Sequence, residues 1–107
     1  MQAVILKTRE HLPGRRNNVK IEAMLQIPEW DIPVWMFVPE TVLQECTAKR
    51  LRGESCRLRG SRIEVNGKVR LKNSGRHGFI ERPRNVRVIE WCTPEVARGQ
   101  EEAQQSG

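Results

Sequence analysis

Apolar and polar residues alternate in the middle of the chain, from Arg62 to Lys72, within a stretch that begins at Gly60. The apolar side of this stretch consists of Ile63, Val65, Gly67, Val69 and Leu71. The other side is polar and largely basic, as expected for a half-buried strand. Gly67 lies on the apolar side, where a missing side chain allows a strand to coil sharply. The pattern therefore predicts one long, strongly bent strand that is apolar inside and basic outside.

A hairpin is the competing interpretation of the same stretch. The Asn-Gly pair at positions 66–67 lies between β-branched runs and is typical of a two-residue hairpin turn. Such a turn would place Val65 opposite Lys68 and would mix apolar with charged groups on both faces. Neither face could then be buried without leaving a charge unpaired. We therefore expect the single strand.

Shorter β-type runs flank the long strand. Residues 3–7 form a first run, and residues 19–27 alternate regularly. Residues 34–38 predict a third strand, which follows a segment bracketed by prolines. A last strand falls within residues 79–91 and is interrupted by Pro83.

A short helix is predicted between the third strand and the long strand. Pro39 and Glu40 suit a first helical turn, since proline fits that position and an early carboxylate complements the helix dipole. Lys49 and Arg50 have the charge that suits a last turn. Gly53 is a natural stop, so we expect the helix to end just before it.

The predicted elements follow one another as strand, strand, strand, short helix, long bent strand and strand. This is the order of the OB-fold, an all-β, five-stranded Greek-key barrel with its helix between strands 3 and 4. An SH3-like barrel is the main alternative, but it normally lacks a helix of this length at that point. We expect an OB-fold nucleic-acid-binding domain over residues 1–92. Residues 93–107 are polar and lack periodicity, so we expect a disordered tail there.

Several strands resemble those of bacterial single-stranded DNA-binding proteins and of the related primosomal replication protein N. Their fourth-strand pattern, Gly-Ser/Asp-x-Val-x-Val-x-Gly-x-Leu/Ile, is similar to residues 60–70, Gly-Ser-Arg-Ile-Glu-Val-Asn-Gly-Lys-Val-Arg. Residues 3–6, 29–38 and 86–91 resemble the first, third and closing strands. The resemblance covers most of residues 1–91. It implies an OB-fold that binds single-stranded DNA and carries base-stacking aromatic residues in its third strand.

Three departures separate the chain from that family pattern. The glycine usual after the first strand is replaced around Lys7 and Thr8. Pro33 and an apparent extra residue shift the parity between Trp30 and Phe37. The C-terminus lacks the acidic, hydrophobic-tipped tail by which single-strand binders recruit partners. The last difference favours primosomal protein N or a plasmid- or phage-borne relative over a housekeeping single-strand binder.

Positive charge is concentrated in the second half of the chain. Residues 49–87 hold thirteen Lys or Arg against three Glu, or +10, and the remainder carries −4, which gives the net charge of +6. Such a local concentration indicates a polyanionic partner such as a nucleic acid. The alternative is a basic face that is simply solvated.

Binding a single strand requires flat side chains against the bases, each stacked base contributing about 1–3 kcal/mol. The aromatic candidates are Trp30, Trp35, Phe37 and Phe79. Position and resemblance favour Trp30, which would otherwise pack under a loop or in a subunit interface. Trp35 and Phe37 share one face and form an exposed platform if the opposite face of their strand is core; otherwise they are buried or lie at a dimer contact. Phe79 could stack at the edge of the neighbouring loop.

Binding also requires cations along the phosphates, and the candidates form three groups. The long strand carries Arg62, Lys68, Arg70 and Lys72. The loop before the last strand and its surroundings carry Arg76, His77, Arg82 and Arg84. The loop after the first strand and the start of the second carry Arg15, Arg16 and Lys20. Each of these cations alone is typical of a solvated charge, but together they repel one another unless a polyanion offsets them. Binding of a nucleic acid by these cations should weaken as salt is added.

Other chemistry finds little support in the sequence. The three cysteines, Cys46, Cys56 and Cys92, are odd in number and lack Cys-x-x-Cys spacing, which argues against a disulfide framework and a zinc site. His11 and His77 have no paired nucleophile or carboxylate at informative spacing, and no phosphate-binding glycine pattern occurs. We therefore expect no catalytic, metal or cofactor site.

No apolar run approaches the roughly 20 residues that span a bilayer, and the apolar N-terminal stretch is too short for a signal peptide. We expect a cytoplasmic protein that binds single-stranded DNA without strong sequence preference, as an accessory in replication, recombination or plasmid or phage maintenance. A homodimer or higher oligomer is expected, because one small barrel offers a short binding path, and a replication or recombination protein is a candidate partner. The alternatives are an RNA-binding OB module and a protein–protein adaptor built on an OB barrel.

Overall fold

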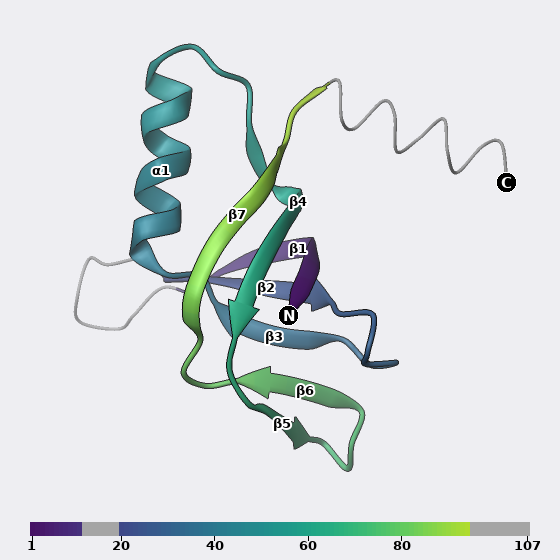
Figure 1. The fold of residues 1–107 in the computed structure, drawn as a ribbon. Helices are drawn as coiled ribbons and strands as arrows, with labels where there is room; N and C mark the ends of the chain where they lie inside the picture. The colour runs from purple at the N-terminus through teal and green to yellow at the C-terminus, as the bar shows by residue number, and fades with distance from the viewer. Residues whose placement is uncertain (12–19, 95–107) are drawn as a thin grey trace, which may run out of the picture.

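The computed structural model describes residues 1–11 and 20–94, and these are mostly β-strand with one helix (Figure 1). In chain order the elements are β1 (Gln2–His11), β2 (Lys20–Gln26), β3 (Val34–Phe37), α1 (Glu40–Leu51), β4 (Arg57–Asn66), β5 (Val69–Lys72), β6 (His77–Ile80) and β7 (Arg84–Cys92). The all-β class and the single helix after the third strand are therefore as predicted. Among the described residues, no helix is long and apolar enough to cross a membrane.

The strands form one mixed sheet in the order β5-β6-β3-β2-β1-β4-β7. All neighbouring strands are antiparallel except β3 and β6, which run parallel. The prediction of five strands in a closed barrel is wrong at this level, since the described part of the chain has seven strands and the sheet is not closed. The extra strands arise because two of the expected strands are each interrupted.

The first interruption divides the long strand predicted over residues 60–72. β4 pairs with β1 and β7, whereas β5 pairs with β6, so the chain bends at Gly67 without reversing (Figure 1). The hairpin alternative is excluded, and the unbroken strand is corrected to two strands. A Cβ at Gly67 would lie 2.7 Å from Cγ2 of Ile80 and 3.4 Å from the carbonyl oxygen of Arg82. Only glycine permits this close backbone approach, which turns the strand.

The second interruption divides the last strand into β6 and β7. Pro83 lies in the break, where it cannot donate a ladder hydrogen bond. Asn85, at the start of β7, has a positive φ of 52°, a conformation that asparagine tolerates better than most residues. As a result β6 continues the sheet beside β3, and β7 runs beside β4.

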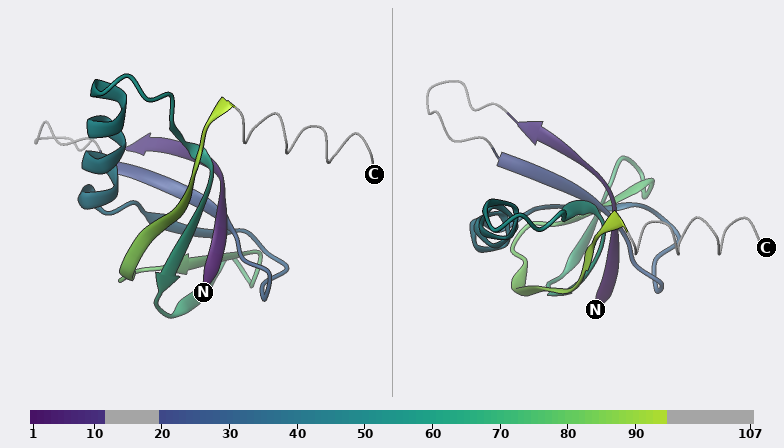
Figure 2. Two further views of the ribbon diagram at one scale, coloured as in Figure 1. Left: turned by 45° about the horizontal axis from the view of Figure 1, so that its top comes forward. Right: turned by 90° about the horizontal axis from the view of Figure 1, so that it is seen from above.

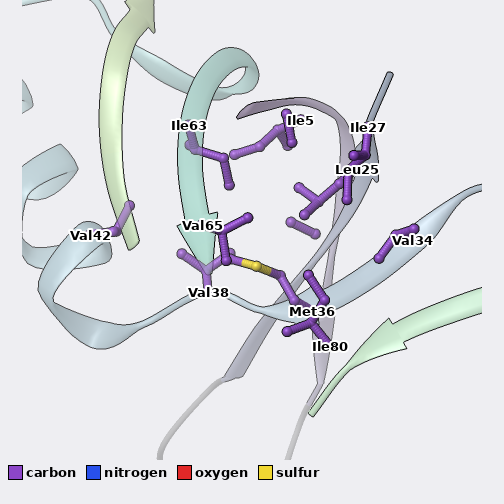
Figure 3. Close-up of a cluster of buried hydrophobic side chains, with 12 residues drawn as sticks. Ile5, Leu25, Ile27, Val34, Met36, Val38, Val42, Ile63, Val65 and Ile80 are labelled. Carbon is purple, nitrogen blue, oxygen red and sulfur yellow. The ribbon is translucent and has the colours of Figure 1, made fainter. Parts of the chain in front are cut away.

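The core lies on the concave side of the sheet (Figure 3). Its larger members are Ile5, Leu25, Ile27, Val34, Met36, Val38, Val42, Ile63, Val65 and Ile80. The apolar side of the long strand is therefore buried at Ile63 and Val65, as predicted. Beyond the bend this no longer holds: Val69 is half-buried, and Leu71 is 57% exposed because β5 is an edge strand.

The helix begins and ends where the sequence predicted. Pro39 precedes its first residue, and the chain leaves the helix before Gly53, which has a φ of 85°. Val42 and Cys46 face inward, and Nε1 of Trp91 donates a hydrogen bond of 3.4 Å to Glu45, which joins α1 to β7. Figure 2 shows the helix beside a strongly twisted sheet whose β1 and β2 ends extend past the other strands.

Candidate nucleic-acid interface

The convex face of β3 carries two aromatic rings. In this strand Val34 and Met36 point into the core, so Trp35 and Phe37 point to the other side. Trp35 is half-buried, and Phe37 is 37% exposed. Of the two arrangements open from the sequence, the structure therefore has the one with the aromatic residues outside.

Two more rings from other strands join this face. The parallel register of β3 with β6 sets Phe79 beside Trp35. The ring centroid of Phe37 lies 6.0 Å from that of Phe79 and 5.4 Å from that of His11 on β1, both in edge-to-face geometry. Edge-to-face contacts at these separations are favourable and leave part of each ring face free. We call these four side chains, His11, Trp35, Phe37 and Phe79, the aromatic patch.

Cations from three strands surround the patch. On β1, the guanidinium carbon of Arg9 lies 4.3 Å from the Trp35 ring centroid, and Nζ of Lys7 lies 5.6 Å from the same centroid. Nζ of Lys20 lies 5.7 Å from the Phe37 centroid, and Nζ of Lys72 lies 5.3 Å from the Phe79 centroid. These distances are in the cation–π range. The rings and the positive charges therefore form one continuous surface.

Glu22 anchors this surface from beneath. The residue is only 4% exposed. Its carboxylate accepts a hydrogen bond from Nε of Arg9 and lies 3.3 Å from Nε2 of His11. The register explains the contact, because Glu22 lies opposite Arg9 on one side and opposite Phe37 on the other. A buried carboxylate needs such partners, and here they fix Arg9 over the indole of Trp35.

A hollow of about 280 Å³ opens between the aromatic and basic side chains. Its lining consists of Arg9, Glu22, Trp35, Lys72, Asn73, His77, Gly78 and Phe79. A planar group could enter between the rings and be surrounded by donors, which is the chemistry that a nucleobase requires.

Several candidate residues predicted from the sequence meet at this site. They are Lys20, Trp35, Phe37, Lys72, His77 and Phe79. They come from β2, β3, β5 and β6, whose pairing brings together segments more than fifty residues apart in the chain.

Other predicted residues lie elsewhere. Trp30 follows β2 in a turn, where its backbone N–H donates a hydrogen bond to the Ile27 carbonyl. Its side chain packs against the core, so it is not part of the patch. Arg62 lies on β4 between Val4 and Glu90, three strands away from Trp35.

The remaining predicted cations lie around the strand breaks or outside the described residues. Arg76 lies in the exposed turn between β5 and β6. A second hollow brings together Lys68, Arg70, Arg82 and Arg84. Arg15 and Arg16 lie outside the described residues, as does most of the predicted tail over residues 93–107.

Sequence reasoning missed four side chains of this surface, Lys7, Arg9, His11 and Glu22. Lys7, Arg9 and His11 occupy alternate positions that continue the first strand, and this spacing was the signal in the sequence that could have placed them on one face. A bulge hid it: the register of β1 shifts between Ile5 and Lys7, which turns Lys7 to the convex face although Ile5 is buried. Simple alternation from Ile5 would have placed Lys7 inside.

The cysteines lie away from the patch. Sγ of Cys46 is 3.8 Å from Sγ of Cys56, and both thiols are buried and unlinked. Burial, followed by the hydrogen bond with Cys56, raises the pKa of the Cys46 thiol. Among the described residues, no group of three His, Cys, Asp or Glu side chains is placed to hold a metal ion.

No protein-family model, curated protein or solved structure matches this chain.

Proposed function

We propose that this chain binds single-stranded nucleic acid on the aromatic patch, with DNA as the expected form. The observation that carries the proposal is the joining of three aromatic side chains, Trp35, Phe37 and Phe79, with cations from β1, β2 and β5 on one face. Stacked bases would cover the rings, and the cations would follow the phosphates. An accessory role in replication or recombination is part of this proposal.

The strand pairing supports a variant of the OB-fold. β4 and β5 together correspond to one bent fourth strand, and β6 and β7 to one bent fifth strand. The parallel pair β3–β6, the antiparallel pair β1–β4 and the helix after β3 are consistent with this correspondence. In OB-folds the face of strands 2 and 3 and the loops next to it bind oligonucleotides. In this chain β2 and β3 carry Lys20, Trp35 and Phe37.

The electrostatics of the patch favour a polyanion. Lys7, Arg9, Lys20 and Lys72 lie over its rings. Two of these cations are paired with carboxylates, Arg9 with the buried Glu22 and Lys72 with the exposed Glu81 at 4.0 Å. Each phosphate neutralised would release condensed counterions. Binding should therefore be strong at low salt, weaker at high salt and tolerant of base sequence.

Tryptophan fluorescence can test the proposal, because the three tryptophans occupy different places. Titration with an oligo-dT of about fifteen nucleotides should quench Trp35 and should weaken with added salt. A Trp35→Phe variant should lose the quenching, whereas Trp30→Phe should retain it, since Trp30 packs against the core. Absence of binding at low salt, or quenching that survives Trp35→Phe, would contradict the proposal. Competition with an oligo-U of equal length separates DNA from RNA as the preferred strand.

A further inference from the structure

A second basic surface lies where the two long strands are interrupted. It is a hollow of about 570 Å³ lined by Asn66, Gly67, Lys68, Arg70, Glu81, Arg82 and Arg84. We call these residues the basic hollow. It contains four cations and one carboxylate, so its formal charge is strongly positive.

The fold itself builds this hollow. The backbone of Gly67 approaches the segment after β6 so closely that a Cβ there would lie 3.4 Å from the carbonyl oxygen of Arg82 and 3.7 Å from Cα of Pro83. On the other side of the break, Asn66 is paired with Arg84. Strand pairing and the close approach at Gly67 therefore bring together the segments that carry these cations.

Most of the positive charge in the hollow is uncompensated. Within residues 1–11 and 20–94, no carboxylate lies within ion-pair distance of Lys68, Arg82 or Arg84. Arg70 reaches Glu81 at 3.6 Å, and Lys72 reaches the same carboxylate at 4.0 Å. Like charges gathered at this density repel one another, and an anion that enters the hollow would relieve that repulsion.

The basic hollow continues directly from the aromatic patch. Arg70 on β5 lies opposite Phe79 on β6, and Lys72 lies over the Phe79 ring. Arg70 and Lys72, the two partners of Glu81, therefore lie where the aromatic patch meets the basic hollow. A strand that stacks on Phe79 would meet Arg70 next and then the remaining cations.

We propose that the basic hollow binds a backbone phosphate of the same strand that the aromatic patch holds, and that Glu81 competes with this phosphate for Arg70 and Lys72. The inference rests on the proposed function and adds to it a path for the strand, from the rings across β5 to the break at Gly67. Glu81 then limits affinity, because the phosphate must displace an intramolecular carboxylate from both cations.

A Glu81→Gln variant tests the competition, and Glu54→Gln is a matched control. Glu54 also bridges two cations, with 3.8 Å to Lys49 and 3.1 Å to Arg52, and its side chain is 50% exposed against 42% for Glu81. It follows α1, outside both surfaces. Each substitution removes one negative charge, so the comparison cancels the change in net charge. Exposed pairs of this kind contribute about 0–1 kcal/mol, so both variants should fold, as thermal melts would verify.

Fluorescence anisotropy with labelled oligo-dT measures the effect. Glu81→Gln should tighten binding about three- to tenfold, since up to two weak ion pairs no longer compete, whereas Glu54→Gln should change it less than about twofold. Equal effects of the two substitutions would overturn the competition.

Inorganic phosphate separates this inference from the proposed function. In NMR titrations of the wild type, phosphate should shift the amide signals of Gly67 and Arg82. The same shifts should require less phosphate in Glu81→Gln and more phosphate in Arg84→Ala. If phosphate does so but oligo-dT does not bind, the proposed function is wrong and the hollow is an anion site alone. If oligo-dT quenches Trp35 but phosphate leaves these amides unshifted, the hollow proposal is wrong and the aromatic patch stands.

Discussion

At the residue scale, the ring of Phe37 lies between two other members of the aromatic patch. It touches His11 and Phe79 in edge-to-face contacts and is still 37% exposed. A ring in this position contributes little to the core and has a free surface for a base.

Replacing Phe37 with alanine should therefore separate binding from stability. We expect Phe37→Ala to weaken oligo-dT binding by about 1–3 kcal/mol, the usual contribution of one stacked base. The midpoint of thermal unfolding should change little. Leu51→Ala is the control, since Leu51 is an apolar side chain with 84% exposure at the end of α1. Anisotropy titrations and melts of both variants measure the two quantities, and a large loss of stability without loss of binding would contradict the assignment.

Glu64 provides a second prediction at this scale. The hydrogen bond from Arg87, at 2.9 Å, and the charge of that guanidinium lower the pKa of the Glu64 carboxyl below its ordinary value. A group whose pKa is lower in the folded state stabilises the fold above its unfolded-state pKa, and this contribution is lost as the pH falls through the folded-state pKa. We expect Arg87→Ala to raise the Glu64 pKa toward its ordinary value in an NMR titration. Lys72→Ala, in a remote strand, should leave it unchanged.

At the scale of elements, the hairpin of β5 and β6 depends on one buried glycine. Gly78 lies opposite Val34 on one side and Leu71 on the other, and its N–H donates a hydrogen bond of 2.9 Å to the Pro33 carbonyl. A Cβ there would lie 2.7 Å from Cγ1 of Val69 and 3.2 Å from Cγ2 of Val34. The hairpin that carries Phe79 and Lys72 can therefore dock on β3 only because this position has no side chain.

We expect Gly78→Ala to destabilise the protein by about 1–3 kcal/mol, the usual cost of overpacking. The double variant Gly78→Ala/Val69→Ala should be less destabilised than the sum of the single variants, because the second substitution removes the clashing methyl group. Urea unfolding of the four proteins in this cycle measures the coupling. Strict additivity would show that the close approach is not the cause.

At the scale of the whole molecule, charge and stacking should act separately. Among the cations over the rings, Lys7 and Lys20 belong to the β1–β2 arm, and Lys72 belongs to the β5–β6 hairpin. The edge strand β5 and the central strands β1 and β2 therefore contribute to one electrostatic surface.

Replacing Lys20 with alanine should reduce the salt dependence of oligo-dT binding. For a single strand the slope of log K against log salt is about −0.7 per phosphate neutralised, so we expect a change of up to about 0.7. Trp35→Phe should preserve the slope, because stacking releases no counterions. Lys49→Ala is the control on α1, where the side chain pairs with Glu54. An unchanged slope in Lys20→Ala would remove this lysine from the interface.

The sequence predicted the local elements well because they depend on local chemistry. Alternation identified β2 and β3, Pro39 and Gly53 marked the limits of α1, and the polar side of residues 60–72 is exposed except for the half-buried Glu64. The interruption at Pro83 was predicted, because the missing N–H of proline is a local property. The break at Gly67 was missed, since it depends on the close approach of Ile80 and Arg82.

For the candidate site, the sequence by itself determined which side chains have the right chemistry, because residue type and period-2 spacing are local properties. Only the tertiary structure decided which of them meet. Strand pairing set Phe79 beside Trp35, whereas it left Trp30 packed against the core and Arg62 three strands away. A bulge in the pairing of β1 with β2 turned Lys7 outward, and the pairing of β4 with β7 set Asn66 beside Arg84. These choices depend on contacts between segments far apart in the chain, which no local pattern records.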